Sequence, residues 1–178
     1  MADSNVDLEA LNAGFRDFIP HNKALALELT RVSTEPTFVE MVMPWNEALI
    51  GNPETRVLHG GVITTLLDAT GGAAVYLHLR APVPIATLDL RIDFLGPSTP
   101  GLPMYARAEC VKATRNVAFV RMVAAHDLNG APLATASATY MFDEGQTRRA
   151  LISQAALERK LVKAHDERLV FASIHRDR

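Results

Sequence analysis

The sequence predicts an α+β fold in which a curved antiparallel sheet wraps around one long central helix. Two observations predict it: strand-like segments lie on both sides of a single helical segment, and that segment is apolar around most of its circumference. A helix of this kind belongs inside a fold rather than on its surface. The 178 residues are enough for one domain with a substantial core.

The first two strands are expected within residues 25–43, which are rich in Leu, Val, Thr, Phe and Met. Glu35 and Pro36 interrupt this run and mark a turn between the strands. Residues 44–58 contain turn-forming Asn, Gly and Pro with little periodicity, so a loop is predicted there. Residues 1–24 form a separate N-terminal segment.

The central helix is predicted over residues 59–79. Apolar side chains and one threonine recur there at steps of three and four residues: Ile63, Leu66, Leu67, Thr70, Ala74 and Leu77. Gly71 and Gly72 weaken this helix locally and allow a neighbouring element to approach closely.

Strands are predicted for the remainder of the domain. Leu88, Leu90, Ile92 and Phe94 alternate with charged residues, which indicates a strand with two different faces. Further strands are expected over residues 104–113, 117–126 and 132–142, and Asn129-Gly130 is a hairpin signal between the last two. The domain therefore covers residues 25–144, and residues 145–178 form an amphipathic helical tail.

Composition excludes several classes of function. The net charge of −2 provides no positive field for nucleic acid, and the single cysteine, Cys110, excludes an intrachain disulfide framework and a multi-cysteine zinc site. The histidines form no helical metal-binding pair, and no serine-hydrolase elbow, phosphate loop or dinucleotide fingerprint occurs. We therefore expect no metal. Because no signal peptide or uninterrupted membrane-length apolar run is recognisable, we expect a cytoplasmic protein without a membrane partner.

The start of the central helix carries the chemistry. A helix N-terminus offers unpaired N–H donors, and Gly60 leaves room for a carbonyl oxygen to approach them, as in half of an oxyanion hole. Asp68 places a carboxylate in an otherwise apolar helix, where it can attack a carbonyl or deprotonate water. A lone helical aspartate usually lies on a solvated face, but its spacing from His59-Gly60-Gly61 favours the functional interpretation.

One chain cannot bring both groups to the same carbonyl. Gly60 and Asp68 are eight residues apart, which corresponds to about 12 Å of helix rise. Two antiparallel copies of the helix would place the N-terminus of one beside the aspartate of the other. The spacing therefore predicts two equivalent sites in a twofold dimer, with a tetramer as the alternative assembly.

These residues resemble the hotdog-fold acyl-CoA thioesterases of the phenylacetate-pathway (PaaI-like) type. The family pattern of His-Gly-Gly, six residues and Asp matches His59-Gly60-Gly61 and Asp68, and residues 87–95 are similar to the strand that follows the helix. The resemblance implies a hotdog fold, an acyl-CoA substrate carrying an aryl, short or medium acyl group, and no cofactor apart from the substrate's own coenzyme A.

The resemblance also implies roles for individual residues. Asp68 corresponds to the nucleophile or general base, the Gly60 N–H to the carbonyl donor, and Thr87 to a hydroxyl that orients the attacking water. His59 would shape the thioester site. Asn52, Gly61 and Thr65 correspond to substrate-binding positions, and Arg115 and Asn116 to the region that meets the coenzyme A nucleotide.

One departure from the family pattern and two alternative functions accompany this interpretation. Many relatives have Asn six residues before the histidine, where this chain has Pro53, and Asn52 lies one residue further away. A hotdog hydratase or dehydratase is disfavoured by the His-Gly-Gly form. A non-catalytic acyl-CoA-binding protein is the other alternative, and binding without turnover would identify it.

Overall fold

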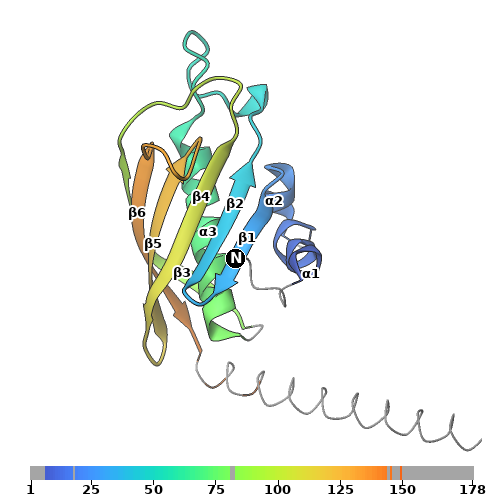
Figure 1. Cartoon of the computed structure of the whole chain (residues 1–178), viewed down its shortest axis with the longest axis vertical. Helices are drawn as coiled ribbons and strands as arrows, with labels where there is room; N and C mark the ends of the chain where they lie inside the picture. The colour runs from blue at the N-terminus through green and yellow to red at the C-terminus, as the bar shows by residue number, and fades with distance from the viewer. Residues whose placement is uncertain (1–6, 18, 81–82, 144, 146–148, 150–178) are drawn as a thin grey trace, which may run out of the picture.

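A computed structural model describes residues 7–17, 19–80, 83–143, 145 and 149. In this part of the chain the elements are, in order, α1 (Leu8–Asn12), the π-helical turn η1 (Ala13–Asp17), α2 (Pro20–Ala24), β1 (Glu28–Thr34), β2 (Thr37–Met43), the short helix η2 (Glu47–Leu49), α3 (Gly60–Leu79), β3 (Ile85–Phe94), β4 (Met104–Ala113), β5 (Val117–Ala125) and β6 (Ala134–Phe142). The strands form one antiparallel sheet in the order β1-β2-β4-β5-β6-β3. Figure 1 shows α3 lying along this sheet, with α1 and α2 beside β1.

The predicted fold class is confirmed. The order of two strands, a loop, one long helix and four more strands agrees with the expectation, and α3 begins within one residue of the predicted position. The Glu35-Pro36 turn joins β1 to β2, and the segment containing Asn129-Gly130 joins β5 to β6.

The core lies between α3 and the sheet. α3 has 20 residues and contains an 18-residue stretch with a mean hydropathy of 1.3, which by length and composition alone would suit a membrane span, but its middle is buried against the strands. The strands that face it carry small side chains, which let the helix approach closely: Ala106, Ala108, Ala118, Ala124, Ala134 and Ala138 are all buried. Gly71 continues this pattern, since an added Cβ there would lie 2.2 Å from the Tyr140 hydroxyl oxygen.

Strand β3 departs from the predicted alternation. The register shifts between Thr87 and Asp89, so Leu88 lies at a β-bulge rather than in the inward-facing series. Leu88 and Phe94 are 56% and 53% exposed, whereas Leu90 and Ile92 are half-buried. The physical reason is that β3 is one of the two edge strands of the described sheet and pairs with β6 alone.

The N-terminal segment packs on the domain. Residues 8–17 and 20–24 form α1, η1 and α2, and Asn12 in this stretch is buried against β1. The first strand begins at Glu28 and not at Leu25, although Leu25 and Leu27 are buried. The predicted amphipathic tail over 145–178 lies outside the described residues apart from positions 145 and 149.

Candidate active site

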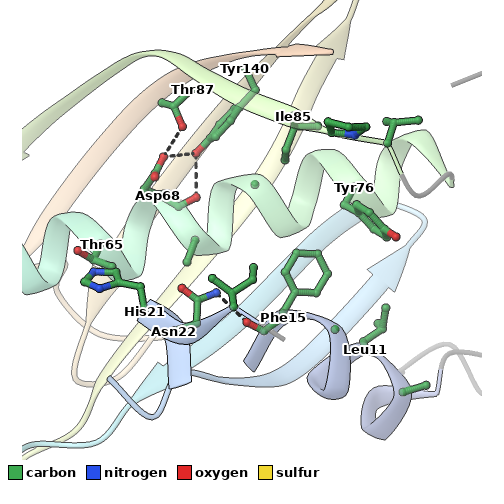
Figure 2. A pocket seen from close by; sticks show the side chains of 17 residues that line it. Leu11, Phe15, His21, Asn22, Thr65, Asp68, Tyr76, Ile85, Thr87 and Tyr140 are labelled. Atoms are coloured by element: carbon green, nitrogen blue, oxygen red, sulfur yellow. Dashed lines mark hydrogen bonds between the residues drawn. The ribbon is translucent and has the colours of Figure 1, made fainter. Parts of the chain in front are cut away.

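Asp68 is held by hydroxyl groups from two strands. It is half-buried on α3, and its Oδ1 accepts a hydrogen bond of 2.8 Å from Thr87 Oγ1 on β3 and one of 3.2 Å from Tyr140 Oη on β6. Figure 2 shows the three side chains converging. Both bonds go to Oδ1, and no described residue donates to Oδ2. One carboxylate oxygen is thus fixed while the other is left for a reacting group.

Tyr140 also reaches the backbone of the helix. Its hydroxyl lies 3.0 Å from the main-chain oxygen of Asp68, so one O–H is shared between the carbonyl and the carboxylate. The side chain is 2% exposed, and burial, followed by the neighbouring Asp68 charge, raises the pKa of this hydroxyl. Tyr140 therefore stays protonated and acts as a donor. The sequence analysis did not identify it.

The start of α3 carries the second predicted group. His59 is the N-cap, and its Nδ1 accepts a 2.9 Å hydrogen bond from the Gly61 N–H. The Gly60 N–H has no acceptor among the described residues. A Cβ at Gly60 would lie 3.2 Å from Cζ of Phe94, so the end of β3 flanks this donor. Gly60 therefore presents a free N–H, whereas the Gly61 donor is already satisfied.

An apolar cleft extends from Asp68. It has a volume of about 780 Å³ and runs between α3, the start of β3 and the N-terminal helices. Asp68, Thr87 and Tyr140 line it, and Figure 2 shows Tyr76 further along α3, with Phe15 of η1 on the opposite side. A second hollow of about 420 Å³ contains His59, Gly61 and Thr65, and Thr65 borders both. Thr65 Oγ1 donates to the Gly61 carbonyl oxygen at 3.1 Å.

The other predicted residues lie elsewhere. Asn52 is exposed, and its Oδ1 accepts from the backbone N–H groups of Glu54 and Thr55 in a local turn. Arg115 and Asn116 lie in the β4–β5 turn, where Asn116 Nδ2 donates to the Phe142 carbonyl oxygen at 3.3 Å. Phe142 pairs with Ile85, so this turn lies at the end of the sheet where β3 begins. The substrate- and coenzyme-binding roles of these residues stay predictions.

Comparison with known proteins identifies the family. The profile described as "Thioesterase superfamily" matches residues 56–127, which include the start of α3 and Asp68. A medium/long-chain acyl-CoA thioesterase of Salmonella typhimurium, YigI, is 33% identical over 136 residues, covering 69% of this chain and 85% of the relative. The chain belongs to the thioesterase superfamily. The Escherichia coli K12 protein of the same name is 32% identical over the same length.

Solved structures of other proteins agree with this fold. A Pseudomonas aeruginosa protein is 36% identical, with a TM-score of 0.67 over 76% of this chain and 98% of that one. A phenylacetic-acid-degradation-related protein of Ralstonia eutropha is 26% identical, with a TM-score of 0.62 over 73% of this chain and 97% of that one. The hotdog fold and membership of a family of thioesterases are therefore confirmed.

Proposed function

We propose that this protein hydrolyses acyl-CoA thioesters, with Asp68 as the nucleophile or general base. The observation that carries the proposal is a carboxylate fixed by Thr87 and Tyr140 where an apolar cleft begins. Such a cleft suits an acyl group, and the fixed carboxylate suits attack on its thioester carbonyl. The names of the Salmonella and Escherichia relatives support the same substrate class.

The reaction needs no cofactor beyond the substrate's own coenzyme A. As a general base, Asp68 takes a proton from water, and the resulting hydroxide adds to the thioester carbonyl. The tetrahedral intermediate then breaks its C–S bond, the coenzyme A thiolate leaves and takes the proton held by Asp68, and the free acid remains. As a nucleophile, Asp68 would instead form an acyl anhydride that water hydrolyses.

A single turnover in water enriched with heavy oxygen detects the nucleophilic route. Attack by the carboxylate followed by hydrolysis at Asp68 leaves label in the peptide containing that residue, which general-base catalysis never does. General-base catalysis labels the free acid alone, as does an anhydride that water opens at its acyl carbonyl. Both routes require the Asp68 carboxylate, so either result is compatible with the proposed function.

We propose that the oxyanion donor is the Gly60 N–H of a second copy. Along β3, Thr87 contacts Asp68 near one end, and Phe94 flanks Gly60 at the other. If two β3 edges paired antiparallel about their middles, Thr87 of one chain would lie beside Phe94 of the other. This pairing would bring Gly60 of each chain to Asp68 of its partner.

The free edge of β3 supports this assembly. Leu88, Phe94 and Leu95 are each more than half exposed there. An exposed, apolar edge strand is prone to pair with another chain. A twofold dimer formed in this way would contain two equivalent active sites.

A proline at position 60 tests the donor directly. Proline is favoured at the first position of a helix, and His59, with φ −64° and ψ 133°, already has the conformation required before proline. Gly60→Pro thus removes the N–H while keeping the helix start, and Gly60→Ala is the matched control that adds a Cβ but keeps the donor. We expect kcat to be about 10²–10³-fold lower in Gly60→Pro than in Gly60→Ala. Equal kcat values would exclude the Gly60 donor.

Mixing two inactive variants tests the shared site. If Gly60→Pro and Asp68→Asn chains exchange at random, half of the dimers are mixed, and each contains one site with neither substitution. Activity should therefore return to about a quarter of the wild-type value. A mixture that stays inactive, although mass spectrometry detects mixed dimers, would show that each chain supplies both groups to its own site.

We also propose that Arg115 and Asn116 bind the nucleotide end of coenzyme A. The turn that carries them lies at the end of the sheet where β3 begins, as does the Val83–Ile85 wall of the cleft. Arg115→Ala should raise KM for acyl-CoA more than it lowers kcat, because a contact remote from the carbonyl contributes uniform binding. An unchanged KM would remove Arg115 from the coenzyme site.

A further inference from the structure

One stripe of α3 forms the floor of the cleft. Its later members lie three, four, seven and eleven residues after the first and so share a face of the helix: Thr65, Asp68, Ala69, Gly72 and Tyr76. Ala69 and Gly72, in the middle of the stripe, have a small side chain and no side chain, respectively. A Cβ at Gly72 would already lie 3.3 Å from Ile85 Cδ1. The floor is therefore a shallow channel that starts at the reacting carboxylate.

The N-terminal helices form the opposite wall. Leu11, Gly14, Phe15 and Ile19 line the cleft from this side. Each of these four is apolar or lacks a side chain, so this part of the segment presents hydrocarbon and backbone toward the floor, whereas α2 adds the polar His21 and Asn22 to the lining. Figure 2 shows Leu11 and Phe15 on these helices across the cleft from α3. The cleft would lose this wall without residues 8–24.

Two buried asparagines hold the wall in place. Asn12 Nδ2 donates to the Leu29 carbonyl oxygen at 3.1 Å, and Asn12 Oδ1 accepts from the Leu29 N–H at 2.8 Å. Asn22 Nδ2 donates to the Phe15 carbonyl oxygen at 2.7 Å. Both side chains are more than nine-tenths buried. These bonds tie η1 to α2 and α1 to β1, so the wall is fixed to the sheet.

Tyr76, the last residue of α3 that lines the cleft, forms an aromatic pair with Phe15. The rings of Phe15 and Tyr76 are 5.3 Å apart and meet edge to face at 87°. Tyr76 lies eight residues after Asp68 on α3, which corresponds to about 12 Å of helix rise. An extended chain of single bonds advances about 1.2 Å per bond, because a fully extended residue of three bonds spans about 3.3–3.6 Å. About ten carbons thus fit between the carboxylate and the aromatic pair.

We propose that the N-terminal helices α1, η1 and α2 form one wall of the acyl-chain pocket and set its length, with Phe15 and Tyr76 as its end. The inference rests on the proposed function, because the thioester carbonyl must lie at Asp68. A straight acyl chain of about ten carbons occupies the channel between η1 and α3. Each methylene up to that length gains buried contact, and methylenes beyond it gain little.

A chain-length series on the full-length enzyme tests the inference. For straight-chain acyl-CoA substrates from butyryl to palmitoyl, kcat/KM should rise by up to about fourfold per added methylene as far as about ten carbons and then level off. A flat series, or one that keeps rising to palmitoyl, would contradict a pocket of this length.

Gly14→Leu shortens the pocket without disturbing the fold. Gly14 lines the cleft, and a Cβ there meets nothing within 4 Å. Ala13→Leu is the matched control, because Ala13 is exposed and does not line the cleft. The ratio of kcat/KM for decanoyl-CoA to that for butyryl-CoA should fall at least about tenfold in Gly14→Leu, equivalent to two lost methylene contacts. The ratio should not change in Ala13→Leu. An unchanged ratio in Gly14→Leu would overturn the inference.

Calorimetric binding separates this inference from the proposed activity. S-decyl-CoA and S-butyl-CoA are thioethers that cannot be hydrolysed, and their relative Kd values report the pocket alone. We expect Gly14→Leu to raise the Kd of S-decyl-CoA by a factor at least about tenfold larger than the factor by which it raises the Kd of S-butyl-CoA. If no acyl-CoA is hydrolysed but this difference appears, the proposed activity fails and the pocket stands. If hydrolysis occurs but the difference is absent, the pocket assignment fails alone.

Discussion

The Tyr140 hydroxyl lies 3.0 Å from the main-chain oxygen of Asp68 and 3.2 Å from its carboxylate Oδ1. A strand near the end of the domain is thus hydrogen-bonded to the middle of the central helix at the proposed catalytic residue. The contact is possible because Gly71, three residues further along α3, has no Cβ to displace the ring. Tyr140 is therefore a positioning residue for Asp68.

Tyr140→Phe should lower kcat about 10- to 100-fold and leave KM within about twofold. A hydrogen bond to a charged group is worth about 1.5–3 kcal/mol, and here it holds the carboxylate at one reacting geometry. Steady-state kinetics with decanoyl-CoA measures both constants. Tyr105→Phe, which removes a hydroxyl elsewhere in the sheet, is the control and should retain wild-type kcat. A Tyr140→Phe enzyme with wild-type kcat would remove the positioning role.

The raised pKa of Tyr140 predicts a loss of stability at high pH. The unfolded chain releases this proton near the ordinary tyrosine pKa of about 10, whereas the folded chain keeps it. The folded state then binds more protons, so the free energy of unfolding falls as pH rises above about 10, by up to about 1.4 kcal/mol per pH unit. The stability advantage of wild type over Tyr140→Phe should shrink across this range. Denaturation curves of both proteins at each pH measure this difference. A difference in the free energy of unfolding that does not change with pH would contradict the raised pKa of Tyr140.

Gly71→Ala should destabilise the fold by about 1–3 kcal/mol, although alanine favours a helix. The added Cβ would lie 2.2 Å from Tyr140 Oη and 2.8 Å from Met122 Sδ, so both side chains must move. Gly72→Ala, whose Cβ would meet Ile85 Cδ1 at 3.3 Å, should change stability by less than about 1 kcal/mol. Urea denaturation compares the two variants. Equal stabilities would show that the core absorbs the methyl group.

Adding Tyr140→Phe to Gly71→Ala should cost less than the sum of the single changes. Removing the hydroxyl oxygen relieves the closest contact that the new methyl group makes. The coupling free energy from a double-mutant cycle is the quantity to measure. Strict additivity would mean that the ring moves away in the Gly71→Ala variant.

Thr87→Val and Thr87→Ser separate the hydroxyl of this residue from its bulk. Thr87 Oγ1 donates to Asp68 Oδ1 at 2.8 Å, and serine can make the same bond. We expect kcat to fall about tenfold or more in Thr87→Val and to change by less than about threefold in Thr87→Ser. Equal kcat values in both variants would limit Thr87 to a packing role.

The fold was predictable because its signals are local. Apolar residues at helical spacing predict α3, and recognisable turn sequences separate β4, β5 and β6. The departure at Leu88 arises at a bulge on the free edge of β3, where alternation no longer separates a buried face from an exposed one. Alternation along a single strand does not reveal which strand lies at the edge.

The candidate site was predictable in part for the same reason. Gly60 and Asp68 lie on one helix at a spacing similar to that of the family. Tyr140 is 72 residues from Asp68, and its sequence neighbours do not distinguish it from any other aromatic residue in a strand. The N-terminal wall was missed because α1, η1 and α2 have five residues each, too few to show helical periodicity. The asparagines that anchor it are polar and suggest a surface segment.

The central claim is that Asp68 is the catalytic carboxylate of an acyl-CoA thioesterase. The most direct test measures thiol release from decanoyl-CoA by wild type and by Asp68→Asn, after both proteins are confirmed as folded. The substitution keeps the size of the side chain but removes the negative charge needed by a base or nucleophile. Wild type should turn over, and kcat should fall about a thousandfold or more in Asp68→Asn. An Asp68→Asn enzyme that releases thiol at the wild-type rate would contradict the assignment of Asp68 as the catalytic residue.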